Sequence, residues 1–145
     1  MTLTFSARPL AAAAAILMAS AATAKAQPAA DFCGRPTAEP AALEAAVAKA
    51  DGVTKVYDGP EYFAFQDAKS EAMFTFTRPA QGPSHPAVVC RKPVKDGDQL
   101  KLQMEIVCRG TPAGCAALEA EFRKLNAQME AHIQSAAGVA TGKPQ

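Results

Sequence analysis

The chain has 145 residues, of which 49% are hydrophobic, 20% are charged and 6% are aromatic, with 11 prolines, 9 glycines and no tryptophan. This balance fits one globular domain and excludes a coiled coil, a collagen-like chain and a wholly disordered chain. The formal net charge of +1 at pH 7 provides no basic excess to neutralise phosphates, so we expect no nucleic acid as a partner.

The first 26 residues have the layout of a secretory signal peptide. One basic residue, Arg8, precedes an apolar stretch from Leu10 to Ala22, and the small residues of Ala24-Lys25-Ala26 follow. The apolar stretch is shorter than the ~20 residues that cross a bilayer, so we expect no membrane span in the mature chain. Cleavage after Ala26, with Ala24 as the alternative site, predicts a periplasmic or secreted protein.

The mature chain is expected to form a single domain over residues 27–135, followed by a flexible C-terminal tail over residues 136–145. The domain begins with a short amphipathic helix from Pro40 to Asp51. Its apolar residues recur at helical spacing, and Gly52 supplies a stop.

Three strands are predicted after this helix, each bounded by a turn sequence. They cover Val53–Tyr57, Tyr62–Gln66 and Glu71–Arg78. A four-residue loop over 67–70 would pair Phe63 with Phe74. In that pairing four phenylalanines share one face of the sheet and are predicted core residues: Phe63, Phe65, Phe74 and Phe76.

Residues 79–87 contain three prolines and one glycine, which predicts a crossing loop rather than a central strand. A hairpin follows, with one strand from Ala87 to Val94 and a second, strictly alternating strand from Leu100 to Ile106. A three-residue loop over 95–97 predicts that Cys90 pairs with Leu102 and lies on the buried face. A two-residue turn at Asp96-Gly97 is disfavoured, because it would expose Cys90 and Val88.

The four cysteines, an even number in a small exported chain, predict two disulfides among Cys33, Cys90, Cys108 and Cys115. A zinc site is disfavoured, because structural zinc sites usually have ligands spaced more closely than these cysteines are. In the predicted hairpin, Cys90 and Cys108 are about 20 Å apart along the strands, which is beyond disulfide reach. We prefer Cys33–Cys90 with Cys108–Cys115, while the crossed pairing, Cys33–Cys108 with Cys90–Cys115, stays open.

A second, longer helix is predicted to begin at Thr111-Pro112, a capping residue followed by proline in the first helical position. Its apolar residues recur at steps of three and four and form a stripe of Cys115, Leu118, Phe122, Leu125, Met129 and Ile133. The periodicity ends near Ser135. His132 would then lie near the end of the helix, where a cation interacts favourably with the helix dipole.

Together these elements predict an α+β fold, in which an antiparallel sheet of about five strands carries both helices on one face. The opposite face is then open to water and carries Tyr62, Met73, Thr75, Thr77, Val89, Arg91, Lys101, Gln103, Glu105 and Val107. Tyr, Met and Arg are enriched where proteins meet. The predicted interaction face therefore consists of Tyr62, Met73, Arg91, Lys101 and Gln103.

The sequence carries no catalytic signature. Glu119 and Glu121 are two residues apart on a helix and point in different directions, so they cannot act as an acid–base pair. His85, in the crossing loop, is expected to be solvated rather than a general base or a metal ligand. No catalytic residue, cofactor or metal site is therefore predicted.

The function predicted from the sequence is a non-catalytic binding or interaction module of the cell envelope, with an unknown protein or envelope component as its partner. One alternative is a small periplasmic hydrolase or transferase, which would bring His85 close to a carboxylate. The other is a carrier of an apolar ligand, which would show a cavity behind the phenylalanine face. The second half of the chain also predicts a basic patch for an acidic partner: Arg78, Arg91, Lys95, Lys101 and Arg109.

Overall fold

The computed structural model describes residues 31–140, so the predicted signal peptide lies outside the described residues. The elements are α1 (Pro40–Ala48), β1 (Val53–Asp58), β2 (Tyr62–Asp67), β3 (Met73–Thr77), the 3₁₀-helix η1 (Pro79–Ser84), β4 (Ala87–Asp96), β5 (Gln99–Cys108) and α2 (Pro112–Ala140). Within the described residues, no helix is both long and apolar enough to cross a membrane. The five strands form one antiparallel meander in sequence order, which confirms the predicted sheet.

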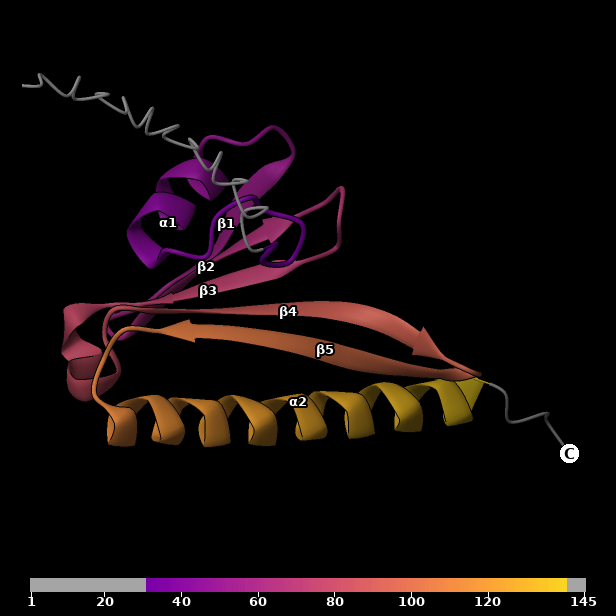
Figure 1. The fold of residues 1–145 in the computed structure, drawn as a ribbon. Helices are drawn as coiled ribbons and strands as arrows, with labels where there is room; N and C mark the ends of the chain where they lie inside the picture. The colour runs from indigo at the N-terminus through magenta and orange to yellow at the C-terminus, as the bar shows by residue number, and fades with distance from the viewer. Residues whose placement is uncertain (1–30, 141–145) are drawn as a thin grey trace, which may run out of the picture.

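The two helices lie on opposite faces of this sheet (Figure 1). Leu43 and Val47 of α1 pack against the phenylalanines of β2 and β3, whereas Leu118 and Phe122 of α2 pack against Val89 of β4. The prediction that both helices share one face and leave the other open is therefore wrong. The central strands carry apolar side chains on both faces, and each face needs its own cover.

The β4–β5 hairpin turns at Gly97-Asp98, so Asp96 pairs with Gln99 and Cys90 pairs with Glu105. The predicted three-residue loop and the Cys90–Leu102 pair are wrong. Gly97 has a φ of 61° in the first turn position, as a tight type II′ hairpin turn requires. This register places Cys90 on the α1 face and Met104 on the α2 face. Since both faces are covered, the burial of Cys90 did not discriminate between the registers.

The four predicted core phenylalanines are buried on the α1 face, as expected. Their pairing differs: Phe63 lies opposite Phe76 and Phe65 opposite Phe74, because the β2–β3 loop is longer than four residues. The shift between the predicted and observed registers is two residues. Side chains on a strand alternate with a period of two, so a register error of two residues leaves the four phenylalanines on one face.

Both preferred disulfides are present, and the crossed pairing is excluded. Cys33–Cys90, with a Cα–Cα distance of 6.4 Å, fastens the N-terminal segment to β4. Cys108–Cys115, with a Cα–Cα distance of 5.7 Å, joins the end of β5 to the first turn of α2. The two links therefore act on opposite faces of the sheet.

The start of α2 is fixed by a cap and by a close backbone approach. The Thr111 hydroxyl accepts a hydrogen bond from the Gly114 amide at 3.1 Å, which confirms the predicted capping residue. A Cβ on Gly114 would lie 2.3 Å from the Pro83 carbonyl oxygen, so only glycine allows α2 to lie this close to η1. At its other end α2 continues to Ala140 instead of ending near Ser135. His132 is consequently not in the last turn, and its predicted dipole role is wrong.

Candidate binding groove

A groove lies between α2 and the first three strands of the sheet. α2 runs along the β4–β5 hairpin (Figure 1), and Tyr62 of β2 meets it through Glu121 and Phe122. The hollow has a volume of about 260 Å³ and is lined by Tyr57, Tyr62, Ala64, Met73, Thr75, Arg91, Glu121, Phe122 and Leu125. α2 supplies one wall and the strands supply the floor.

Strand register brings the floor residues together. Tyr57 of β1 pairs with Ala64 of β2, and Ala64 pairs in turn with Thr75 of β3, so these three form one row across the sheet. Met73 of β3 pairs with Arg91 of β4 in a second row. A β-bulge between Lys55 and Tyr57 sets the register of the edge strand. The floor is therefore assembled from four strands that no local pattern connects.

The wall on α2 is an apolar strip that the sheet does not bury. Of the predicted stripe, Leu118 and Phe122 are buried, but Leu125 is 38% exposed and Met129 is 39% exposed. Asn126 faces the sheet instead, because a straight helix advances 3.6 residues per turn and the stripe drifts away from the contact. A second hollow of about 280 Å³ follows, lined by Leu125, Gln128, Met129, His132 and Ile133. Leu125 lines both hollows, and every residue that lines the second one lies on α2.

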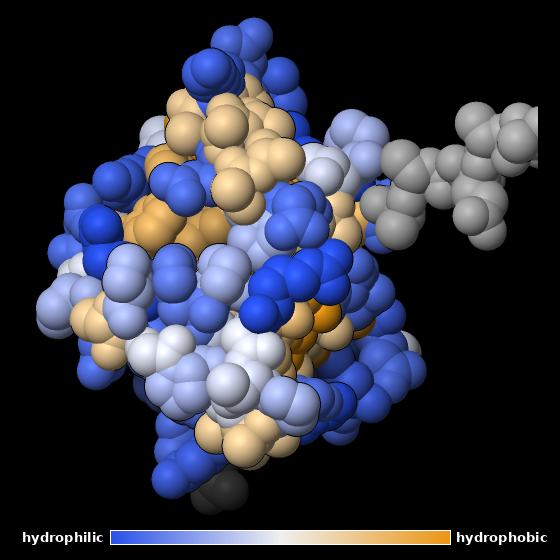
Figure 2. Space-filling model, turned by 60° about the vertical axis from the view of Figure 1, so that its left-hand side comes forward, coloured by the Kyte–Doolittle hydropathy of each residue, from blue (hydrophilic) through white to orange (hydrophobic). Residues whose placement is uncertain are grey.

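Large hydrophobic side chains reach the surface near this groove and at the neighbouring edge strand. On the face shown in Figure 2, hydrophobic patches are separated by hydrophilic side chains. The exposed large hydrophobic residues of the described chain are Val56, Tyr57, Leu125 and Met129. Tyr57, Leu125 and Met129 line the two hollows, and clustering of this kind marks binding surfaces more than isolated exposed residues do.

Tyr62 stands at the mouth of the groove and connects its floor to its wall. Its hydroxyl donates to Glu121 Oε2 at 3.0 Å, and its ring meets Phe122 edge-on, with ring centroids 5.7 Å apart. Burial and the hydrogen bond to Glu121 both raise the pKa of Tyr62 well above its usual value. The phenol consequently stays protonated at neutral pH and serves as a hydrogen-bond donor, not as a nucleophile.

Arg91 lies on the groove floor between two thioethers. Its Nη2 donates to Met73 Sδ at 3.2 Å and its Nη1 to Met129 Sδ at 3.4 Å. The guanidinium carbon is 5.3 Å from the centroid of the Phe122 ring, within cation–π range. Nε is buried without a hydrogen-bond partner in the described structure. Burial lowers the pKa of Arg91.

Three of the five residues predicted as the interaction face converge in this groove: Tyr62, Met73 and Arg91. Lys101 and Gln103 do not join them, because the observed hairpin register turns both toward the α1 face. For the same reason Glu105 and Val107 leave the predicted open face, while Thr75, Thr77 and Val89 are buried rather than open to water. Tyr57 and Glu121 were not predicted as site residues. The exposure of Leu125 depends on the drift of α2 across the sheet.

His85, the candidate general base or metal ligand, has a structural role. His85 is half-buried rather than solvated, and its Nδ1 lies 3.2 Å from the Thr77 hydroxyl, which itself accepts a hydrogen bond from the Ala87 amide at 2.8 Å. This network ties the crossing loop to β3 and β4. Across residues 31–140, no group of three or more His, Cys, Asp or Glu is placed to hold a metal ion.

Three of the five residues of the predicted basic patch pair with carboxylates. Arg78 pairs with Asp58, Lys101 pairs with Asp96, and Arg109 Nε lies 3.2 Å from Glu39 Oε2. Of the other two, neither has an ion pair among the described residues: Lys95 is exposed, whereas Arg91 is half-buried on the α2 face.

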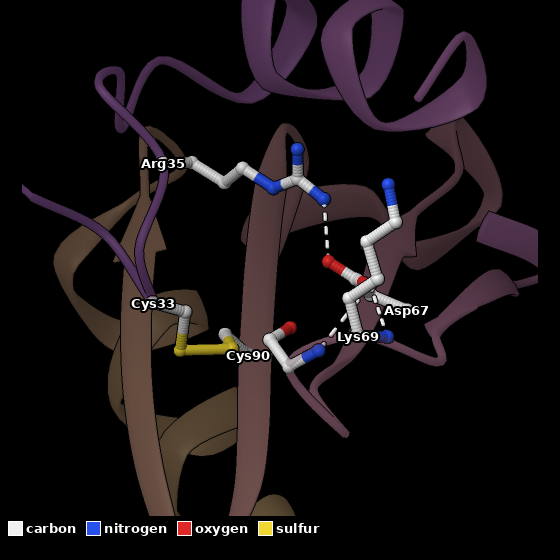
Figure 3. A network of polar contacts seen from close by, with 6 residues as sticks. Cys33, Arg35, Asp67, Lys69 and Cys90 are labelled. Atoms are coloured by element: carbon white, nitrogen blue, oxygen red, sulfur yellow. Dashed lines mark hydrogen bonds and ion pairs between the residues drawn. A yellow bond between two sulfur atoms is a disulfide. The ribbon is translucent and has the colours of Figure 1, made fainter. Parts of the chain in front are cut away.

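A polar network on the other face of the sheet is structural (Figure 3). Arg35 Nη2 lies 2.6 Å from Asp67 Oδ2, and the Lys69 amide donates to Asp67 Oδ1 at 2.9 Å. Burial alone would raise the pKa of Asp67, but hydrogen bonds from Lys69 and Ser70, together with Arg35, lower it. The network therefore caps the β2–β3 turn and holds the N-terminal segment beside it.

This network predicts a loss of stability in acid. The folded-state pKa of Asp67 is below the unfolded value near ~3.9, so its contribution is complete above about pH 4 and is lost as pH falls through the folded pKa. Each unit of lowering corresponds to about 1.4 kcal/mol. The free energy of unfolding, measured with urea at about pH 6 and about pH 3, should differ less between the two pH values for Asp67→Asn than for the parent protein. Asp98→Asn, in the exposed hairpin turn, is the control; an Asp67→Asn difference equal to the parent's would contradict the prediction.

No protein-family model matches the chain, and no curated protein or solved structure matches it either. Function is therefore inferred from the groove and the side chains that line it.

Proposed function

We propose that the protein is an exported, non-catalytic binding module that holds an apolar ligand in the groove between α2 and β1–β3. The observation that carries this proposal is the exposed apolar strip of α2: Leu125 faces a floor made by four strands, and Met129 Sδ lies 3.4 Å from Arg91 Nη1 on that floor. Binding sites of small ligands are concave and mostly apolar, with a few polar groups that fix orientation. The groove has this composition.

Export to an oxidising compartment is part of the proposal. The two disulfides support it, because disulfides persist in secreted and periplasmic proteins and are rare where glutathione keeps thiols reduced. The cell envelope or the extracellular space is then the place where the ligand is met.

The competing hypotheses receive less support. A hydrolase would need His85 beside a carboxylate, whereas its Nδ1 lies 3.1 Å from the carbonyl oxygen and 3.2 Å from the hydroxyl of Thr77. A carrier that holds its ligand behind the phenylalanine face would need space there, but α1 packs against that layer through Leu43 and Val47. The apolar-ligand idea itself is retained, with its site moved to the α2 face.

A single charge on the α2 side of the groove should weaken binding. We expect Leu125→Asp to weaken binding of the neutral fluorophore N-phenyl-1-naphthylamine by at least about tenfold, because an aspartate there must be desolvated by the ligand. Leu125 is only 38% exposed, so the free energy of unfolding should fall by about 1–2 kcal/mol, which leaves the protein folded. Probe fluorescence titration measures the first quantity and urea unfolding the second.

Ala120→Asp is the matched control, since it adds the same charge to an exposed position of α2 that does not line the groove. It should bind the probe as the parent protein does. Equal affinity of the Leu125→Asp and Ala120→Asp proteins would overturn the proposed site, and so would failure of the parent protein to bind the probe.

A further inference from the structure

Arg91 is the one arginine of the described chain whose charge the fold leaves without an acidic partner. The other four each pair with a carboxylate: Arg35 with Asp67, Arg78 with Asp58, Arg109 with Glu39 and Arg123 with Glu119. Arg91 donates only to the sulfur atoms of Met73 and Met129, and thioether sulfur is a weak acceptor. Its buried Nε has no partner at all within residues 31–140.

The half-buried Arg91 guanidinium therefore has N–H donors that no strong acceptor satisfies. A guanidinium has five N–H donors in a planar fork that matches the two oxygens of a carboxylate. A desolvated charge is costly unless it is paired, so an anion that reaches the fork would gain a charge-assisted pair in a partly dry site. Among the described residues that line the first hollow, Arg91 is the single cation.

The one anion of the hollow does not satisfy Arg91. Glu121 is engaged by the Tyr62 hydroxyl at 3.0 Å, and no ion pair within 4.0 Å joins it to Arg91 in the described structure. Glu121 instead disfavours polyanions, since a second negative group near the mouth would be repelled. The groove therefore favours a single negative charge.

The shape of the groove indicates what carries that charge. From Arg91 the apolar surface continues along Leu125 and Met129 to Ile133, through the two hollows that share Leu125. The volume of the first hollow, about 260 Å³, is below the ~300–1,000 Å³ typical of sites for drug-sized ligands, so a longer ligand must extend along α2 toward the second hollow. Methionine walls adapt to a flexible chain, because their side chains are unbranched and polarizable.

We propose that the groove binds a free fatty acid, with its carboxylate paired to the Arg91 guanidinium and its alkyl chain lying along Leu125, Met129 and Ile133. This inference rests on the proposed function and adds the ligand class. Without the ligand, the guanidinium donates to the thioether sulfurs of Met73 and Met129. When the ligand binds, its carboxylate replaces them as the acceptor. Tyr62, held by Glu121, borders the head-group end.

The test uses three ligands with the same alkyl chain and different head groups: decanoate, decanol and decyltrimethylammonium. Isothermal titration calorimetry on the oxidised protein, with each ligand below its micelle concentration, should show decanoate binding at least about tenfold more tightly than decanol. Decyltrimethylammonium should bind more weakly than decanol. Arg91→Met, which replaces the guanidinium with an apolar side chain of similar length, should abolish the preference for decanoate over decanol. Arg109→Met, at an exposed arginine outside the groove, should leave the preference intact.

The outcomes separate this inference from the proposed function. If decanoate and decanol bind equally well, the apolar groove stands and the fatty-acid assignment falls. If no alkyl ligand binds and the neutral fluorophore also fails to bind, both proposals fall. Two further results would contradict the assignment of a fatty acid and indicate another ligand for the groove. One is an apolar peptide that binds through its free C-terminal carboxylate, but not as its amide, while decanoate fails to bind. The other is a dimer in sedimentation equilibrium that Arg91→Met dissociates.

Discussion

Replacing Cys33 and Cys90 together by alanine is expected to lower the free energy of unfolding by about 4 kcal/mol. The disulfide closes a loop with a sequence separation of 57 residues, and the loss of chain entropy in the unfolded state grows with the logarithm of that length. Cys90 is fully buried, so alanine is preferred to serine, which would add an unpaired hydroxyl to the core. With total stabilities of about 5–15 kcal/mol for domains of this kind, the loss is large.

The second disulfide supplies a control with the same chemistry. Cys108–Cys115 has a sequence separation of 7, so its removal by two alanines should cost only about 2.5 kcal/mol. Urea unfolding of both double variants, followed by circular dichroism, gives the two values. A loss for the short loop equal to or larger than that for the long loop would contradict the explanation from loop length.

Phe74→Ala is expected to destabilise the protein by about 3–5 kcal/mol. Phe74 has no exposed surface and lies opposite Cys90 in the sheet, within the layer that α1 covers. Its ring also makes a cation–π contact with Arg35, whose guanidinium carbon lies 5.7 Å from the ring centroid. The substitution therefore removes apolar contacts, leaves a cavity and disturbs the anchor of the N-terminal segment.

The matched control for Phe74→Ala is Val56→Ala on the edge strand. Val56 is 52% exposed, so its truncation should change stability by about 0.5 kcal/mol or less. Urea unfolding at neutral pH compares the two proteins. A loss below about 1 kcal/mol for Phe74→Ala would mean that the phenylalanine layer is not the core of the domain.

These two predictions concern the α1 face, whereas binding is proposed on the α2 face. The β2 and β3 strands contribute to both, since Phe63 and Phe65 point to α1 while Tyr62 and Ala64 point to the groove. A closely packed phenylalanine layer therefore holds the groove floor in position before a ligand arrives. Preorganisation of this kind reduces the entropy that binding must overcome.

Much of the architecture followed from local patterns in the sequence. The stripe around Leu118 and Phe122 predicted α2, Thr111-Pro112 predicted its start, and the preferred pairing of the four cysteines is the one observed. The shared face of the four phenylalanines was also predictable. These features depend on spacing along one segment, or on an alternation that a two-residue slip does not change.

The observed hairpin register and the candidate groove were decided only by the tertiary structure. The sequence was compatible with a three-residue loop, and the actual turn at Gly97-Asp98 sent Lys101 and Gln103 to one face and Arg91 to the other. Burial was a guide to register only if one face was open, and here the helices cover both faces. The groove arises because α2 lies along β4 and β5 and meets β2 at Tyr62, which leaves a hollow over the neighbouring part of β1–β3. Helix placement of this kind depends on contacts between segments far apart in the chain, which no local period records.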